Sequence, residues 1–516
     1  MTEQRHRAPA WRAAATPGQV LGPAVGLVVL LLLVALVLQP GAFAVRVGGA
    51  YDRSLVGTAP EVGPSGLPGG GQAAPPREDP DPGRDVMSQS DRGAAAVDAL
   101  VDLLRARDVA VVSGDATAWM TASADPSDAM APDGSFVALT ALPVTRFESF
   151  VVPDTVSVVE SAADIVAADP AATDPAAADP AASQVWSARV ETTYELAGGP
   201  AVVRTDTVRL EPTEDGVGWR AAGWTPHPGL DQGGTVAPWD LGEVTATVGE
   251  RGVVVSWADP ATPEDGAVPS ERLQRAQVRA GQVSTWVERG AVVVDSYLGT
   301  GWPRSTLVLA PATTAQYDDL VPGPVPERPD VFAAVTTDVR TPDGGGDLVV
   351  LNPTAQGELV EETWQVTVTH ELVHVASGAV FGDGQEVWLA EGLADLVGWS
   401  SVVPAEVNRE DVAGRLLDRV RDGRADVQAL PDGDDFTAPD ADVVGDAYEG
   451  AWLAALLLQD ELGVDGLLAV YQDASDGDAP TVERTDAALV EATGDGREAF
   501  QARWTAYLTG LAGPPR

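Results

Sequence analysis

Two of the chain's four histidines lie four residues apart in the run VTHELVHVASG, residues 368–378, and Glu371 directly follows the first of them. On a helix, His370 and His374 return to one face with a rise of about 6 Å, so both rings can bind one metal ion. On a strand they would lie about 13 Å apart, too far to share an ion. Glu371 would point about a third of a turn away, where it can take a proton from a water on the metal. The spacing therefore predicts a helical zinc site with a general base.

A third ligand must come from elsewhere in the chain, because no histidine follows His374. The run WLAEGLADLVG, residues 388–398, offers Glu391, with room before it for a loop and a return helix. Asp395 follows one helical turn later on the same face. A carboxylate there can accept the free N–H of a ligand histidine and fix its tautomer.

The two motifs THELVH and WLAEGLAD together resemble the signature of the gluzincin metallopeptidases, the thermolysin and aminopeptidase N-type group with a peptidase MA-like domain. The resemblance implies that His370, His374 and Glu391 bind one Zn²⁺ per chain. It also implies that Glu371 is the catalytic base and that Asp395 is the partner of His370.

Gluzincins also need a donor for the oxyanion that forms during peptide hydrolysis. In the aminopeptidase group a tyrosine at the start of a later helix has this role, and the run AYEGAWLAALLLQDELG resembles that helix. The resemblance makes Tyr448 the candidate donor, with Tyr471 and Tyr507 as alternatives. The competing interpretation is a tyrosine that only packs at the start of a helix.

The region before the histidine helix, AAVTTDVRTPDGGGDLVVLNP, limits the choice of substrate. It lacks the glutamate with which aminopeptidases hold the free amino group of a substrate, so aminopeptidase specificity is not supported. Its strand–turn–strand pattern predicts a hairpin at a sheet edge, which could bind a peptide backbone by strand addition. The predicted substrate is a peptide or protein.

The N-terminal residues predict a membrane anchor. Residues 20–38 are apolar and uncharged, and they follow a tail, residues 1–19, that contains Arg5, Arg7 and Arg12. Nineteen helical residues span about 28 Å, close to the hydrocarbon core, and the arginines favour a cytoplasmic tail with the body outside the cell membrane. An A-x-A site ending at Ala44 leaves a cleaved signal peptide and secretion as the alternative.

Composition restricts the partners. The formal net charge is −45, which repels nucleic acid and anionic lipid, so nucleic acid is not an expected partner. The chain has no cysteine, which excludes a disulfide framework. Residues 39–90 are rich in proline and glycine and predict a disordered linker between the membrane and the body.

The remaining chain predicts an α+β protein with two folded regions. Helical periodicity followed by alternating strands in residues 91–230 resembles the nuclear transport factor 2-like cone, and residues 231–242 are the expected boundary. Residues 243–512 predict a small sheet, the active-site helices and a helical tail, the order of a gluzincin metallopeptidase domain. A non-catalytic cell-surface protein that retains the peptidase fold is the competing hypothesis, and the presence of Glu371 beside a full set of ligands favours the enzyme.

Overall fold

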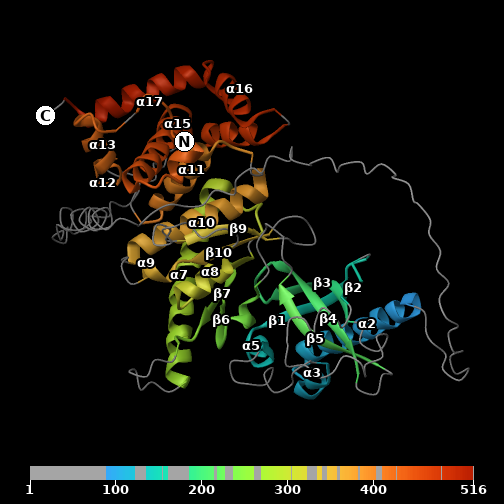
Figure 1. The fold of residues 1–516 in the computed structure, drawn as a ribbon. Coiled ribbons are helices and arrows are strands. Elements are labelled where there is room, and N and C mark those ends of the chain that lie inside the picture. The colour runs from blue at the N-terminus through green and yellow to red at the C-terminus, as the bar shows by residue number, and fades with distance from the viewer. Residues whose placement is uncertain are drawn as a thin grey trace, which may run out of the picture.

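The computed structural model describes residues 89–122, 135–153, 155–160, 185–213, 218–226, 236–260, 269–303, 305–321, 334–339, 346–356, 361–381, 384–402, 409–425, 427–477 and 479–514. The predicted tail and anchor, the linker up to residue 88 and the Asp-Pro-Ala repeat at residues 167–183 lie outside them. None of the described helices has the length and apolarity needed to span a bilayer. The described chain is a mixed α+β protein with two five-stranded sheets (Figure 1).

The first region places helices before an antiparallel sheet, in the predicted order. Its elements are α2 (Gln89–Ser113), α3 (Ala116–Ala122), α5 (Ser135–Ala141), β1 (Val144–Val151), β2 (Ser157–Glu160), β3 (Val185–Leu196), β4 (Ala201–Pro212) and β5 (Trp219–Pro226). The strand order is β1-β3-β4-β5, and β2 also pairs with β3. One face of α2 buries Leu100 and Leu104 against Val190 and Val208 of the sheet. The apolar faces that the sequence predicts for the helix and for the strands thus pack against each other. The likeness to the nuclear transport factor 2-like cone stays a prediction.

The expected boundary near residues 231–242 includes a short helix, η1 (Pro238–Asp240), that packs into the first region. The ring of Trp239 lies 4.7 Å from that of Tyr194 and 5.8 Å from that of Phe147. A single cluster of buried apolar side chains runs from α3 and α5 through η1 into the second sheet. The two predicted domains therefore share a core.

The second sheet consists of β6 (Val244–Val248), β7 (Gly252–Trp257), β8 (Thr306–Ala310), β9 (Ala334–Val339) and β10 (Gly346–Leu351). Its order is β6-β7-β8-β10-β9, with parallel pairs in the centre and antiparallel pairs at both edges. Every residue of β7 and β8 is buried, which is the pattern of strands covered on both faces. The helix α7 (Pro269–Leu298) connects β7 to β8 and packs on β6 and β7. The β9–β10 hairpin lies at the sheet edge, as the sequence predicts.

The remaining described elements are helices. They are α8 (Thr314–Leu320), α9 (Pro353–Gln356), α10 (Glu361–Phe381), α11 (Val387–Ser400), α12 (Arg409–Val412), α13 (Gly414–Arg421), α14 (Gly433–Phe436), α15 (Ala441–Ser475), α16 (Thr481–Thr493) and α17 (Arg497–Ala512). Of these, α11, α13, α15, α16 and α17 lie in the upper part of the molecule in Figure 1, and α8 and α9 lie beside the second sheet. The long helix α15 changes direction at Gly463, whose φ of 75° suits glycine. It packs along α11 and so supports the helix that carries Glu391.

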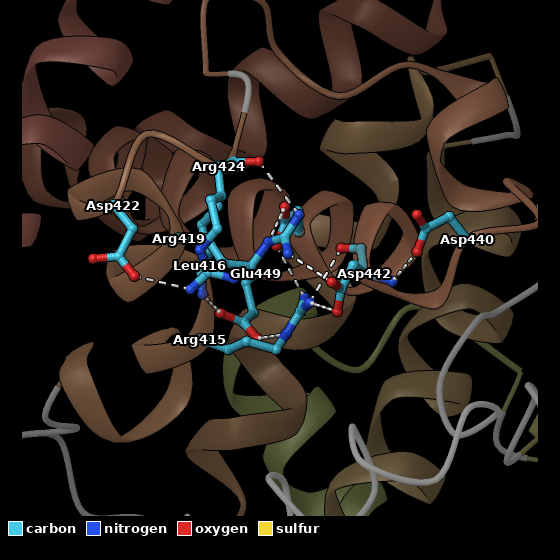
Figure 2. A network of polar contacts seen from close by, with 9 residues as sticks. Arg415, Leu416, Arg419, Asp422, Arg424, Asp440, Asp442 and Glu449 are labelled. Carbon is cyan, nitrogen blue, oxygen red and sulfur yellow. Dashed lines mark hydrogen bonds and ion pairs between the residues drawn. The ribbon is translucent and has the colours of Figure 1, made fainter.

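A network of ion pairs fixes the first half of α15 against α13 (Figure 2). Arg415 lies 3.1 Å from Glu449 and 3.3 Å from Asp446. Arg419 lies 2.9 Å from Asp446 and 2.6 Å from Asp442. Because both arginines contact more than one carboxylate, the network holds α13 and α15 together at several points along their length.

The network predicts a pH dependence of stability. Burial raises the pKa of Glu449 to about 7 although Arg415 lowers it, whereas its ordinary value is 4.5. Between these two values the folded state binds more protons than the unfolded state, so stability falls as pH rises, by at most about 1.4 kcal/mol per pH unit. In Glu449→Gln, this fall of the free energy of unfolding with rising pH should disappear, as measured by denaturant unfolding at several pH values. The exposed Glu498→Gln is the control, and equal slopes in wild type and Glu449→Gln would contradict the prediction.

Candidate metal centre

The helix α10 carries His370, Glu371 and His374 and is held by burial. Its β-branched run has a weak intrinsic preference for helix, but Val368, Leu372 and Val373 are at most 1% exposed. The helix packs on α7 and α11, and it also contacts the β9–β10 hairpin. Tertiary packing therefore determines the helical geometry that brings the two imidazoles to one face.

The helix α11 carries Glu391 and lies close to both α10 and α15 because of two glycines. A Cβ atom added to Gly398 would lie 3.1 Å from the carbonyl oxygen of Val366 on α10. A Cβ atom added to Gly392 would lie 2.4 Å from the carbonyl oxygen of Ala451 on α15, which is too close for any side chain. Gly392, the glycine of the WLAEGLAD motif, is therefore needed for packing, because it lets α11 lie close to its neighbours and bring Glu391 to the histidines.

The three predicted ligands converge. His370 Nε2 lies 3.1 Å from His374 Nε2 and 3.2 Å from Glu391 Oε2. His374 Nε2 lies 3.5 Å from Glu391 Oε1. One ligand atom from each of the three side chains lies within 4.8 Å of the others. The cluster is buried or nearly so, and it can hold a metal ion.

The donor atoms fit a tetrahedral zinc ion. Two ligand atoms at about 2.0–2.1 Å from one tetrahedral ion lie about 3.3 Å from each other, which is close to the three separations observed. Both carboxylate oxygens of Glu391 are buried and have no hydrogen-bond partner among the described residues, although the imidazole nitrogens lie nearby. Buried carboxylate oxygens are rarely left without a partner, because the loss of hydration costs free energy. A cation bound between the three side chains would supply that partner.

Asp395 lies behind His370. Its Oδ1 atom is 2.8 Å from His370 Nδ1, so the imidazole can donate its Nδ1–H to the carboxylate and keep Nε2 as an acceptor or ligand. Asp395 lies on the same face of α11 as Glu391, which is four residues earlier. One helix thus supplies both a candidate ligand and the side chain that orients another.

The charges at the centre favour a cation. Burial lowers the pKa of His370, but the carboxylates of Asp395 and Glu391 outweigh it and raise that pKa well above its ordinary value. Burial raises the pKa of Glu391, but His374 and His370 outweigh it and lower that pKa to about 2. The carboxylates of Glu391 and Asp395 thus stabilise positive charge on His370, and a divalent cation can take the place of the proton.

Glu371 lies beside the cluster and makes one side-chain hydrogen bond among the described residues. Its Oε2 atom accepts from the hydroxyl of Thr336 on β9 at 2.6 Å, and its Oε1 atom is buried without a partner. Burial raises the pKa of Glu371. A buried carboxylate of raised pKa with a free oxygen is suited to accept a proton.

The candidate oxyanion donor Tyr448 lies in α15, in the half that packs along α11. Its ring is buried and packs edge-on against Phe436 at 4.9 Å. The alternative Tyr471 donates its hydroxyl to Ser377 Oγ at 3.2 Å, and Tyr507 packs near Arg409. The structure therefore brings together His370, Glu371, His374, Glu391 and Asp395, and the role of Tyr448 as an oxyanion donor stays a prediction.

The contact between Asp395 and His370 makes a specific prediction. Asp395→Asn keeps the shape of the side chain but removes the charge that favours the Nδ1–H tautomer of His370. Zinc affinity or peptide turnover should fall by roughly 10–100-fold. Affinity can be measured by competition with a chromophoric chelator, and unchanged affinity together with unchanged turnover would show that Asp395 does not act through the histidine.

Thr336 was not predicted from the sequence as a site residue. It lies in the predicted edge hairpin, but the alternation of that strand alone does not show which residue faces α10. The packing of β9 on α10 determines this, and it depends on the whole order of the second sheet.

Comparison with known proteins gives structural likenesses but no sequence relative. No family model and no curated protein matches the chain. Among solved structures, the chain is similar to a crystal structure of a mutant M1 zinc metallopeptidase from Deinococcus radiodurans, with 14% identity and a TM-score of 0.29 over 75% of this chain and 70% of that one. A likeness at this level does not define the fold, so the function has to be argued from the chain's own residues.

Proposed function

We propose that the protein is a zinc metallopeptidase of gluzincin type that hydrolyses peptide bonds in peptides or proteins. The observation that carries the proposal is the buried carboxylate of Glu371, with one free oxygen, directly beside the cluster of His370, His374 and Glu391. A purely structural metal site is normally closed by four protein ligands and needs no adjacent base, whereas a catalytic site has three ligands and an open position.

Each side chain has a defined role in this proposal. His370, His374 and Glu391 would hold Zn²⁺, which when bound acts as a Lewis acid towards a carbonyl group and a water molecule. Glu371 would accept the proton of the attacking water and later deliver it to the leaving amine. Asp395 would keep His370 in the tautomer that presents Nε2 to the ion. Tyr448 is retained only as a proposed donor to the oxyanion.

The second sheet offers a place for the substrate backbone. β9 is an edge strand paired only with β10 among the described strands, and it packs on α10 beside Glu371. An extended peptide could pair with its free side by main-chain hydrogen bonds.

In this proposal residues 243–512 form a gluzincin domain and residues 91–230 form a nuclear transport factor 2-like region. The apolar run at residues 20–38 supports a location of the body outside the cytoplasmic membrane, anchored or secreted.

The test is a digest of a broad peptide library by the protein, read by mass spectrometry with and without a zinc chelator. We expect cleavage that is lost with chelator and restored by added zinc. A protein that binds zinc and peptide but cleaves nothing in the library would support the competing hypothesis of a non-catalytic surface protein.

A further inference from the structure

The side chain of Thr336 reaches from the sheet edge to the carboxylate of the candidate base. Its hydroxyl lies 2.6 Å from Glu371 Oε2 and 3.4 Å from the carbonyl oxygen of Glu371. A hydroxyl has a single proton to donate. The carboxylate oxygen Oε2 is closer than the carbonyl oxygen and, because it is charged, is the stronger acceptor, so Thr336 donates to Oε2. Glu371 Oε1 is buried and has no hydrogen-bond partner in the described part of the chain. One oxygen is therefore held and the other is left free.

We propose that Thr336 is a positioning residue that fixes the orientation of the Glu371 carboxylate, an inference that rests on the proposed peptidase function. The terminal torsion of a glutamate side chain is soft, so a carboxylate without a fixed partner can rotate freely. A donor on a rigid strand selects one orientation, in which the lone pairs of Oε1 remain available to the attacking water. Precise orientation matters because a displacement of about 1 Å can cost roughly 100-fold in rate.

The strand that carries Thr336 is itself firmly placed. β9 pairs with β10 over residues 334–339, and Thr336 lies opposite Val349, which is buried in the core. Because β9 is also the edge at which a peptide backbone is proposed to pair, one strand would position both the substrate and the base. A shift of β9 would then move the scissile bond and the hydroxyl that orients Glu371 together.

The test compares three variants of the full chain. Thr336→Val removes the hydroxyl and keeps the shape, and Thr336→Ser keeps the hydroxyl. Thr306→Val on β8 is the control, because Thr306 is a threonine of the same sheet whose buried hydroxyl has no hydrogen-bond partner in the described part of the chain. We expect kcat on a cleaved library peptide to fall by roughly 10–100-fold in Thr336→Val with KM little changed. Thr336→Ser should restore most of the rate, and Thr306→Val should retain it.

A double variant shows whether Thr336 acts through Glu371. In the Glu371→Gln background, Thr336→Val should cause no further loss of kcat, because residues that act as a unit are not additive. A loss of equal size in both backgrounds, or a loss in Thr336→Val that Thr336→Ser does not restore, would overturn the proposal.

A structural measurement separates this inference from the proposed function. In a crystal structure of metal-free Thr336→Val, the Glu371 carboxylate should adopt a different or mixed orientation, whereas in metal-free Thr336→Ser it should match the wild type. An unchanged, single orientation in Thr336→Val would overturn the positioning role. If the wild-type protein binds zinc but cleaves no peptide, the peptidase function fails, and this measurement still decides whether Thr336 orients Glu371.

Discussion

Glu371→Gln should fold, bind zinc and bind peptide like the wild type, yet turn over peptide at least about 10²–10⁴-fold more slowly. The amide keeps the size of the side chain, and its oxygen can still accept the hydrogen bond from Thr336. The amide cannot take a proton from the attacking water. The three candidate ligands are unchanged, so the loss should appear in kcat rather than in metal content.

The control for this substitution is Glu362→Gln, which makes the same change on an exposed position of α10. It should turn over peptide at the wild-type rate. Steady-state kinetics on one library-derived peptide, with zinc content measured on the same samples, would compare the two. Equal rates for wild type and Glu371→Gln would show that the activity belongs to a contaminant or that the base is another residue.

The second large effect concerns the metal itself. The wild-type protein should contain one tightly bound zinc per chain, and His370→Ala, His374→Ala or Glu391→Ala should each lose it. Each change removes one of the three candidate ligands found among the described residues, and Glu391→Ala also removes a buried carboxylate that would balance the charge of the ion. Elemental analysis after dialysis measures the stoichiometry.

Glu362→Ala serves as the control here, since it removes an exposed carboxylate from the same helix. It should retain one zinc per chain. A well-folded wild-type protein without zinc, even after incubation with the metal, would contradict both the metal site and the function built on it.

The sequence was sufficient for the parts of the centre that depend on local spacing. The four-residue separations of His370 from His374 and of Glu391 from Asp395 predict a shared face on a helix, and the structure has both pairs on helices that face each other. The edge hairpin was predictable from a run of strand residues interrupted by glycines. Each of these features depends on residues close together in the chain.

The features that could not be predicted depend on long-range packing. The contact of Thr336 with Glu371 requires β9 to lie on α10, and the close crossing at Gly392 requires α15 to lie on α11. The boundary between the two folded regions was predicted from composition, which does not show that Trp239 packs between Phe147 and Tyr194. Such contacts depend on the shape of the whole core rather than on any local pattern.

The shared core at Trp239 has a consequence for how the protein unfolds. Because one apolar cluster extends from the N-terminal helices through η1 into the second sheet, the loss of either region would expose that surface to water. Regions joined in this way tend to melt in one cooperative transition, whereas domains connected by a free tether melt separately. The described residues of the first region would then act as part of the scaffold that keeps the region with the candidate metal centre folded, with a single calorimetric transition as the thermal signature of both regions.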